Sequence, residues 1–138
     1  MVDVSCDEDK KETATSLGAS DFIDARKGNP GAALRDLGGA ALVLTTALSS
    51  EAITPLIKGL NMQGKLVIVS VPGPITINTA DLLKYGISVQ AWPIGNNKDS
   101  EKAIDFADGH RFFGVVEKFP VALSTTGLRY VSLDLFTR

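Results

Sequence analysis

Apolar runs typical of β-strands alternate along the chain with segments whose apolar residues recur at helical spacing. Two runs, at residues 40–46 and 65–71, are almost entirely apolar, which predicts buried strands. Shorter strand-like segments are found at residues 1–5, 22–23, 87–91 and 115–116. Because strands of this length alternate with helices, the pattern predicts an α/β fold with a mainly parallel sheet.

Residues that start and stop helices separate these strands. Asn29 followed by Pro30 predicts a helix start, since asparagine caps helices and proline is favoured at the first helical position. The next helix, capped by Ser49 or Ser50, carries one apolar face as far as about residue 60. The pattern also predicts a turn at 61–64 and three more helices, at 7–17, at 80–84 after a cap at Asn78 or Thr79, and from a cap at Asp99 or Ser100 to about 107.

The ends of the predicted strands are the first candidates for a ligand site. In parallel sheets of this kind, ligands bind at the carboxyl ends of the strands. Those ends carry Ser5, Thr45 and Thr46, then Ser70, Val71 and Pro72, and finally Trp92, Pro93 and Ile94. The pattern alone therefore predicts a ligand edge, but no reaction.

Composition excludes several classes of partner. The net charge is −2, so nucleic acid and anionic membranes are not expected partners. The adjacent basic residues Arg26 and Lys27 are interpreted as solvated surface. No apolar run approaches the roughly 20 residues of a membrane span, and the polar start, residues 1–11, does not resemble a secretory signal. With a single cysteine, a cytoplasmic location is expected.

Metal chemistry is restricted by the same counts. The chain has one cysteine, Cys6, and one histidine, His110, which cannot provide the four Cys or His ligands of a structural zinc site. His110 lies in a polar turn and is expected to be exposed.

Several segments together resemble the zinc-type, medium-chain alcohol dehydrogenases. They are the helix-to-strand passage from Lys10 to Asp24, the strand Leu66-Val67-Ile68-Val69-Ser70-Val71-Pro72, and the stretch Ser88-Val89-Gln90-Ala91-Trp92-Pro93-Ile94-Gly95. The likeness covers roughly residues 2–120, whereas residues 121–138 diverge. It implies that residues 1–138 form a single, partial nucleotide-binding domain of Rossmann type. Relatives interconvert alcohols and aldehydes or ketones with NAD or NADP, and their zinc polarises the substrate oxygen.

The resemblance also assigns roles to the strand ends. It places Ser5 where the adenosine ribose is read. It places Thr45, Thr46, Ser70, Val71 and Pro72 on the nicotinamide side, with backbone contacts to the carboxamide from Trp92, Pro93 and Ile94. Two alternatives stay open: Thr45 and Ser70 could simply end their strands with local hydrogen bonds, and Trp92 could be a partly buried anchor.

Parts of the family pattern are not found in this sequence. We expect an incomplete doubly wound sheet, because the first strand, its glycine-rich phosphate loop and the zinc ligands have no counterpart. Either the second strand of the family order then pairs with the fourth, or two edges are exposed. We therefore expect modest solubility and no turnover by the chain alone. The alternative function is a non-catalytic nucleotide-binding or pairing module, or a degenerate remnant.

The choice of cofactor depends on Ser5. NAD enzymes place a carboxylate at this position, so a serine favours NADP over NAD. Asp7 and Glu8 would repel the 2′-phosphate of NADP, although Lys10 or Lys11 could offset them. By resemblance, a homodimer would form through the strand at 87–91.

Overall fold

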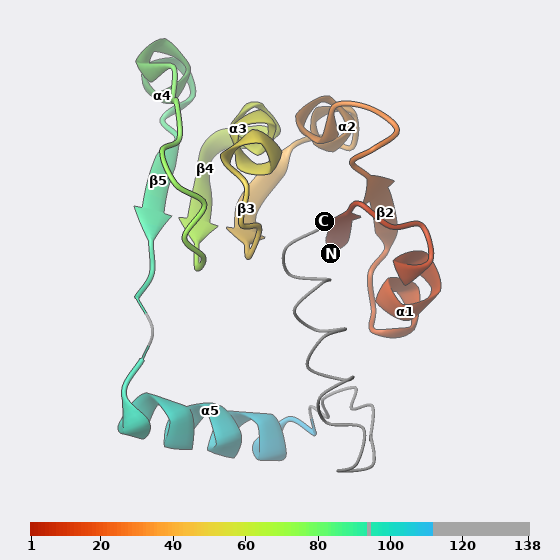
Figure 1. Ribbon diagram of the computed structural model, residues 1–138, viewed down its shortest axis with the longest axis vertical. Helices are drawn as coiled ribbons and strands as arrows, with labels where there is room; N and C mark the ends of the chain where they lie inside the picture. Colours follow the sequence, from red (N-terminus) through yellow and green to blue (C-terminus); the bar gives the residue numbers. More distant parts are fainter. Residues whose placement is uncertain (94, 112–138) are drawn as a thin grey trace. The chain divides into compact units, whose positions relative to one another are not determined.

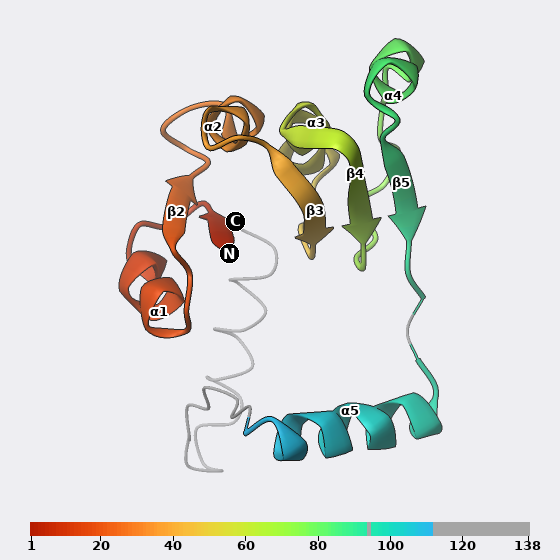
Figure 2. The same ribbon diagram turned by 180° about the vertical axis from the view of Figure 1, so that it is seen from behind.

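The strands in the described part of the chain form two short parallel sheets. The computed structural model describes residues 1–93 and 95–111. The first sheet pairs β1 (Val2–Ser5) with β2 (Asp21–Asp24), and the second has the order β3 (Ala40–Thr45), β4 (Leu60–Ile68), β5 (Ser88–Ala91) (Figures 1 and 2). All pairs are parallel, which confirms the predicted α/β class. Among the described strands β1 pairs only with β2, so the second strand of the family order does not pair with the fourth.

Within the described residues, five helices connect or follow these strands. They are α1 (Lys10–Ser16), α2 (Pro30–Asp36), α3 (Ser50–Lys58), α4 (Thr79–Tyr85) and α5 (Asn97–Gly109). Asn29, Ser49 and Asn78 cap their helices as predicted, each accepting backbone N–H groups at its side-chain oxygen. The predicted cap of α5 was wrong, because Asn96 caps it and Asp99 completes a capping box from the third helical position.

The chain divides into two compact units, residues 1–94 and residues 95–138. The first contains both sheets and helices α1 to α4, and the second contains α5. The strand predicted at 115–116 and the divergent residues 121–138 lie outside the described residues.

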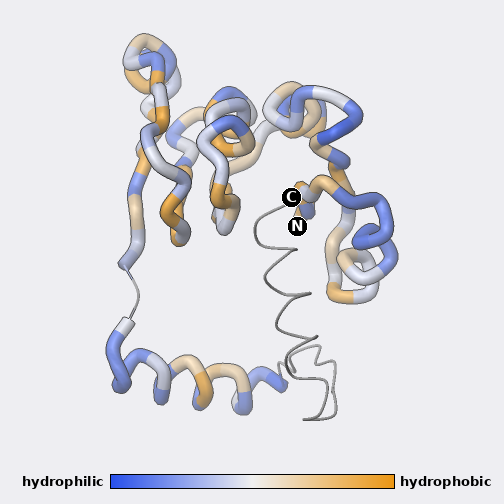
Figure 3. Tube along the Cα trace, in the orientation of Figure 1, coloured by the Kyte–Doolittle hydropathy of each residue, from blue (hydrophilic) through white to orange (hydrophobic). Residues whose placement is uncertain are grey.

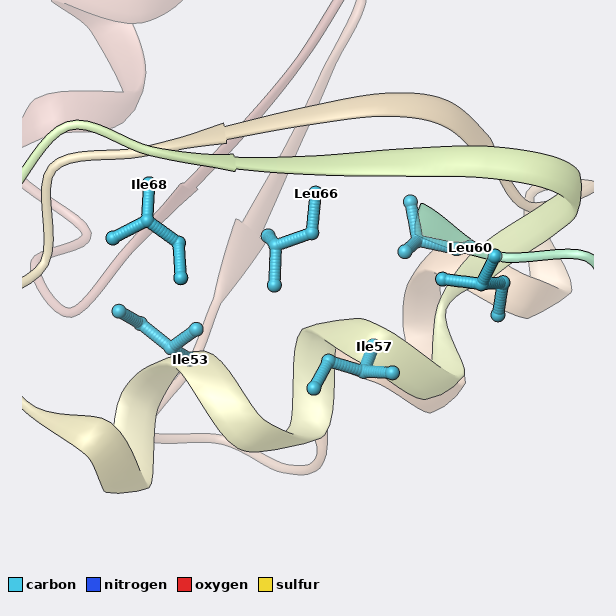
Figure 4. Packing of buried hydrophobic residues seen from close by; sticks show 6 residues of the cluster. Ile53, Ile57, Leu60, Leu66 and Ile68 are labelled. Carbon is cyan, nitrogen blue, oxygen red and sulfur yellow. The ribbon is translucent and has the colours of Figure 1, made fainter. Parts of the chain in front are cut away.

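The core lies between α3 and the second sheet (Figure 4). Ile53, Leu60 and Leu66 are fully buried, and Ile57, Ile68 and Ile87 complete the cluster. The predicted apolar face of α3 is therefore confirmed. Burial of this face stabilises a helix of nine residues that would not be stable alone in water.

Strand β4 differs from the prediction at both ends. The segment 61–64 is not a separate turn, because β4 already begins at Leu60. Leu60 pairs with Ala40 and Lys65 with Leu42, so residues 61–64 bulge out of the ladder. The strand ends at Ile68 rather than at residue 71, and the connection to α4 has no regular structure.

Strand β3 is buried on one face only, which corrects the expectation of a buried strand. Val43 packs against the core, while Leu42 and Leu44 are 60% and 63% exposed. Figure 3 shows the hydrophobic colouring of this part of the chain. The side chains of a strand alternate between its two faces, and α3 covers only the face of Val43.

Helix α2 approaches α3 closely through two glycines. A Cβ atom at Gly31 would overlap the carbonyl oxygen of Pro55 in α3. A Cβ atom at Gly59, just after α3, would lie 2.9 Å from the Cβ of Leu34 in α2. This contact fixes α2 and the loop that leads into it from β2.

Candidate functional site

The loops after β3 and β4 are joined by two hydroxyl groups. Thr45, which is 4% exposed, ends β3, and its Oγ1 accepts a hydrogen bond from the backbone N–H of Ala47 at 3.2 Å. The Oγ of Ser70 donates to the carbonyl oxygen of Ala47 at 2.6 Å. Thr45 therefore has the local partner that its structural alternative requires, whereas the partner of Ser70 lies 23 residues earlier and ties the loop after β4 to the loop after β3.

Other predicted site residues around these loops are accessible. Thr46 is exposed, Val71 is 88% exposed, and Trp92, which follows β5, is 63% exposed. The backbone N–H of Trp92 donates to the carbonyl oxygen of Ile68 at 2.9 Å, which holds Trp92 beside the end of β4. Pro72 is half-buried and Pro93 is exposed, whereas Ile94 lies outside the described residues.

Ser5 lies in the other sheet, at the carboxyl end of β1. In the parallel ladder its partner is Asp24, the last residue of β2. The backbone N–H of Ala25 donates to the carbonyl oxygen of Ser5 at 2.8 Å, so the chain leaves β2 directly beside Ser5. The structure thus gathers the predicted residues of β3, β4 and β5, and gives Ser5 a different set of neighbours.

Those neighbours form a charged cluster that joins the loops after β1 and β2. Arg26 Nη2 lies 2.8 Å from Asp7 Oδ1, and Arg26 Nε lies 3.7 Å from Asp24 Oδ1. Lys27 Nζ pairs with Glu8 and lies 4.0 Å from Asp24 Oδ2. Figure 3 shows the hydrophilic stretches after β1 and between β2 and α2. The hydrogen bond to Glu8, supported by attraction to Glu8 and Asp24, raises the pKa of Lys27.

Sequence analysis missed this cluster because it interpreted Arg26 and Lys27 as solvated surface. Their partners Asp7 and Glu8 both lie 19 residues earlier in the chain. The one available signal was the equal spacing of two cations and two carboxylates after successive parallel strands.

A shallow pocket adjoins the cluster at the start of α2. Its volume is about 310 Å³, and its lining includes Ile23, Asp24, Lys27, Asn29 and Asp36. The pocket is small for a whole dinucleotide, since ligand pockets usually measure about 300–1,000 Å³ for drug-sized molecules.

The described residues do not provide a zinc site. In residues 1–93 and 95–111, no three His, Cys, Asp or Glu side chains lie together as metal ligands. Cys6 is exposed. His110 ends α5, where its ring stacks on Phe106 with centroids 4.0 Å apart and its Nδ1 lies 2.8 Å from the carbonyl oxygen of Phe106. Zinc therefore does not fit the described residues.

None of the helices in the described part of the chain is long and apolar enough to cross a membrane.

Comparison with solved structures supports the Rossmann-like fold. An alcohol dehydrogenase from the archaeon Aeropyrum pernix matches 97% of this chain with 40% of its own length, at a TM-score of 0.84 and 19% identity. A Sinorhizobium meliloti 1021 chain solved bound to NADP matches 78% of this chain with 34% of its own length, at a TM-score of 0.67 and 22% identity. At these identities the likeness concerns the fold alone.

Comparison with curated sequences identifies relatives of higher identity. Alcohol dehydrogenase notN of Aspergillus sp. is 48% identical over 121 residues, and alcohol dehydrogenase patD of Penicillium expansum is 46% identical over 121 residues. In both cases the match covers 88% of this chain but 36% of the relative. The family described as zinc-binding dehydrogenase matches residues 1–109. The chain therefore belongs to the zinc-binding dehydrogenases, the zinc-type alcohol dehydrogenase family of oxidoreductases.

Proposed function

We propose that this chain contributes dinucleotide contacts to an NADP-dependent oxidoreductase that interconverts alcohols and aldehydes or ketones. The observation that carries the proposal is the arrangement after β3, β4 and β5. There Thr45 and Ser70 fix two loops through Ala47, and accessible residues surround them. Such strand ends are where α/β sheets bind ligands. The nicotinamide, when bound, would take a hydride from the alcohol or return one to the carbonyl carbon.

In this proposal the predicted site residues have two kinds of role. Thr46, Val71 and Pro72 line the nicotinamide side, and Trp92, Pro93 and Ile94 offer backbone groups to the carboxamide. Thr45 and Ser70 act mainly by positioning, because their hydroxyls already bond to Ala47. Ser5 faces the adenosine ribose, where the absence of a carboxylate favours NADP over NAD.

The whole reaction is proposed for the family member and not for these residues alone. The chain spans about a third of the length of the curated relatives it matches. No three His, Cys, Asp or Glu side chains among the described residues are arranged as metal ligands. We therefore propose that the 138-residue chain binds cofactor without turnover, in the cytoplasm.

A second candidate function is a pairing module without catalysis. Strands β1 and β3 each have one edge unpaired among the described strands, and Leu42 and Leu44 are exposed on β3. Unpaired edges with apolar side chains favour association with another strand. A homodimer through β5 would be one form of this association.

The experiment is a titration of the purified chain with NADPH and NADH, monitored by Trp92 fluorescence. Trp92 is the only tryptophan, so quenching with energy transfer to the reduced nicotinamide reports binding beside β5. Saturable quenching, stronger for NADPH, supports the proposal. No change at millimolar concentrations of either cofactor would contradict it. A dehydrogenase assay with added zinc then tests turnover, and measurable activity would overturn the proposed inactivity of the chain alone.

A further inference from the structure

The cations of the charged cluster lie outside its carboxylates. The side chains of Arg26 and Lys27 are 59% and 62% exposed, whereas those of Asp7 and Asp24 are 18% and 9% exposed. An anion that approaches from solvent therefore meets the guanidinium and the ammonium before it meets these two carboxylates. The fifth member, Glu8, is 59% exposed and is the one outer carboxylate.

We propose that Arg26 and Lys27 bind the 2′-phosphate of NADP and so determine cofactor specificity. This inference rests on the proposed function, which places the adenosine ribose at Ser5. Asp24 pairs with Ser5 across the ladder, and Arg26 and Lys27 follow Asp24 by two and three residues. The cations thus stand beside the ribose position although they come from the next strand.

The chemistry of the two cations suits this role. A guanidinium has five N–H donors; the Nη2 group of Arg26 pairs with Asp7 and its Nε faces Asp24 at 3.7 Å, so the Nη1 group can bind phosphate oxygens. Pairing with Arg26 and Lys27 also reduces the repulsion that Asp7 and Glu8 would exert on a phosphate. The two residues therefore supply positive charge to the loop that follows β2, beside the carboxyl end of β1.

The test compares substitutions on the two sides of the same ion pairs. Arg26→Gln removes a phosphate ligand and should weaken NADPH binding about fivefold, with NADH affinity changed less than about twofold. Lys27→Gln should act in the same direction. Glu8→Gln removes the exposed carboxylate and frees Lys27, so it should strengthen NADPH binding. The effects should shrink as salt is raised, because the groups are exposed.

A purely structural cluster would give a different result. Arg26→Gln and Asp7→Asn break the same ion pair, so a structural role predicts a loss of stability in both variants and the same direction of change for both cofactors. The proposal is supported if Arg26→Gln weakens NADPH binding and Asp7→Asn strengthens it, while NADH binding shows no such opposite changes. An unchanged ratio of NADPH to NADH affinity in Arg26→Gln and Lys27→Gln would overturn it.

Lys58→Gln is the matched control for loss of one positive charge. Lys58 ends α3, where its carbonyl oxygen accepts from Arg35 near the C-terminal end of α2, whereas Arg26 precedes the N-terminal end of that helix. It should leave the ratio of affinities unchanged. If the unsubstituted chain binds neither cofactor, the proposed function itself fails. That outcome is distinct from cofactor binding that Arg26→Gln leaves unchanged, which would overturn only the role of Arg26.

Discussion

The contact between α2 and α3 depends on the absence of a side chain at Gly59, and Gly59→Ala tests it. Gly59 has φ of −81° and ψ of −9°, a conformation that alanine adopts without strain. Considered by backbone entropy alone, the substitution would stabilise the protein by about 0.4–1 kcal/mol. Packing predicts the opposite sign.

The magnitude follows from the atoms that the new methyl group would meet. Its Cβ would lie 2.9 Å from Leu34 Cβ and 3.0 Å from both the Gly31 carbonyl oxygen and Leu34 Cδ1. Leu34 is 5% exposed and cannot turn away freely. Overpacking of this kind costs about 1–3 kcal/mol, so a net loss of about 1–2 kcal/mol is expected after the backbone gain.

Urea unfolding followed by far-ultraviolet circular dichroism measures this loss. The control is Gly28→Ala, where the new Cβ would have no atom within 4 Å, and it should be neutral or slightly stabilising. Because α2 carries the loop of Arg26, Gly59→Ala should also weaken NADPH binding. A Gly59→Ala protein as stable as the unsubstituted one, beside a neutral Gly28→Ala, would refute the close contact between α2 and α3.

Four further substitutions test other parts of the structure. Leu66→Ala opens a cavity in the fully buried core and should cost about 2–5 kcal/mol in urea unfolding; a loss below about 1 kcal/mol would mean that the site is not packed as described. Asn29→Ala removes the cap that accepts from Gly31 and Ala32 and should cost about 0.5–2 kcal/mol, whereas unchanged stability would deny the cap a role. Ser5→Asp adds a carboxylate at the end of β1 and should lower the NADPH to NADH affinity ratio about fivefold or more in parallel titrations; an unchanged ratio would remove Ser5 from the ribose site. Leu42→Lys should reduce self-association in sedimentation velocity, since it places a charge on the exposed face of β3; unchanged association would exclude that face as the cause.

Local sequence determined most of the secondary structure. The cap at Asn29 with Pro30 after it, and the apolar face of α3, both depend on residues within one or two helical turns. Such short-range interactions involve only residues that are close in the sequence, so the sequence pattern is enough to predict them. The end of β3 at Thr45 followed from the same local pattern to within one residue, whereas β4 ends at Ile68, two residues before Ser70.

Other features depend on segments that are distant in the sequence. The bulge at 61–64 arises because β4 must match β3 at both Ala40 and Leu42, which the pattern of either strand alone does not encode. The hydrogen bond from Ser70 to Ala47 requires β3 and β4 to be neighbours, whereas the one between Ala47 and Thr45 is local. Such partners are fixed by chain packing, so sequence reasoning could place the hydroxyls at the strand ends but not decide whether local bonds engaged them.

The charged cluster shows the same division most clearly. The sequence by itself determined that Ser5 ends a strand and that Asp7 and Glu8 follow it. On that basis the two carboxylates would repel the 2′-phosphate of NADP and so oppose the preference that Ser5 indicates. Only the tertiary structure decided that β2 pairs with β1 in a register that brings Arg26 and Lys27 onto those carboxylates. The physical reason is that pairing between parallel strands joins residues separated by a whole helix, and electrostatic partners are chosen by distance in space.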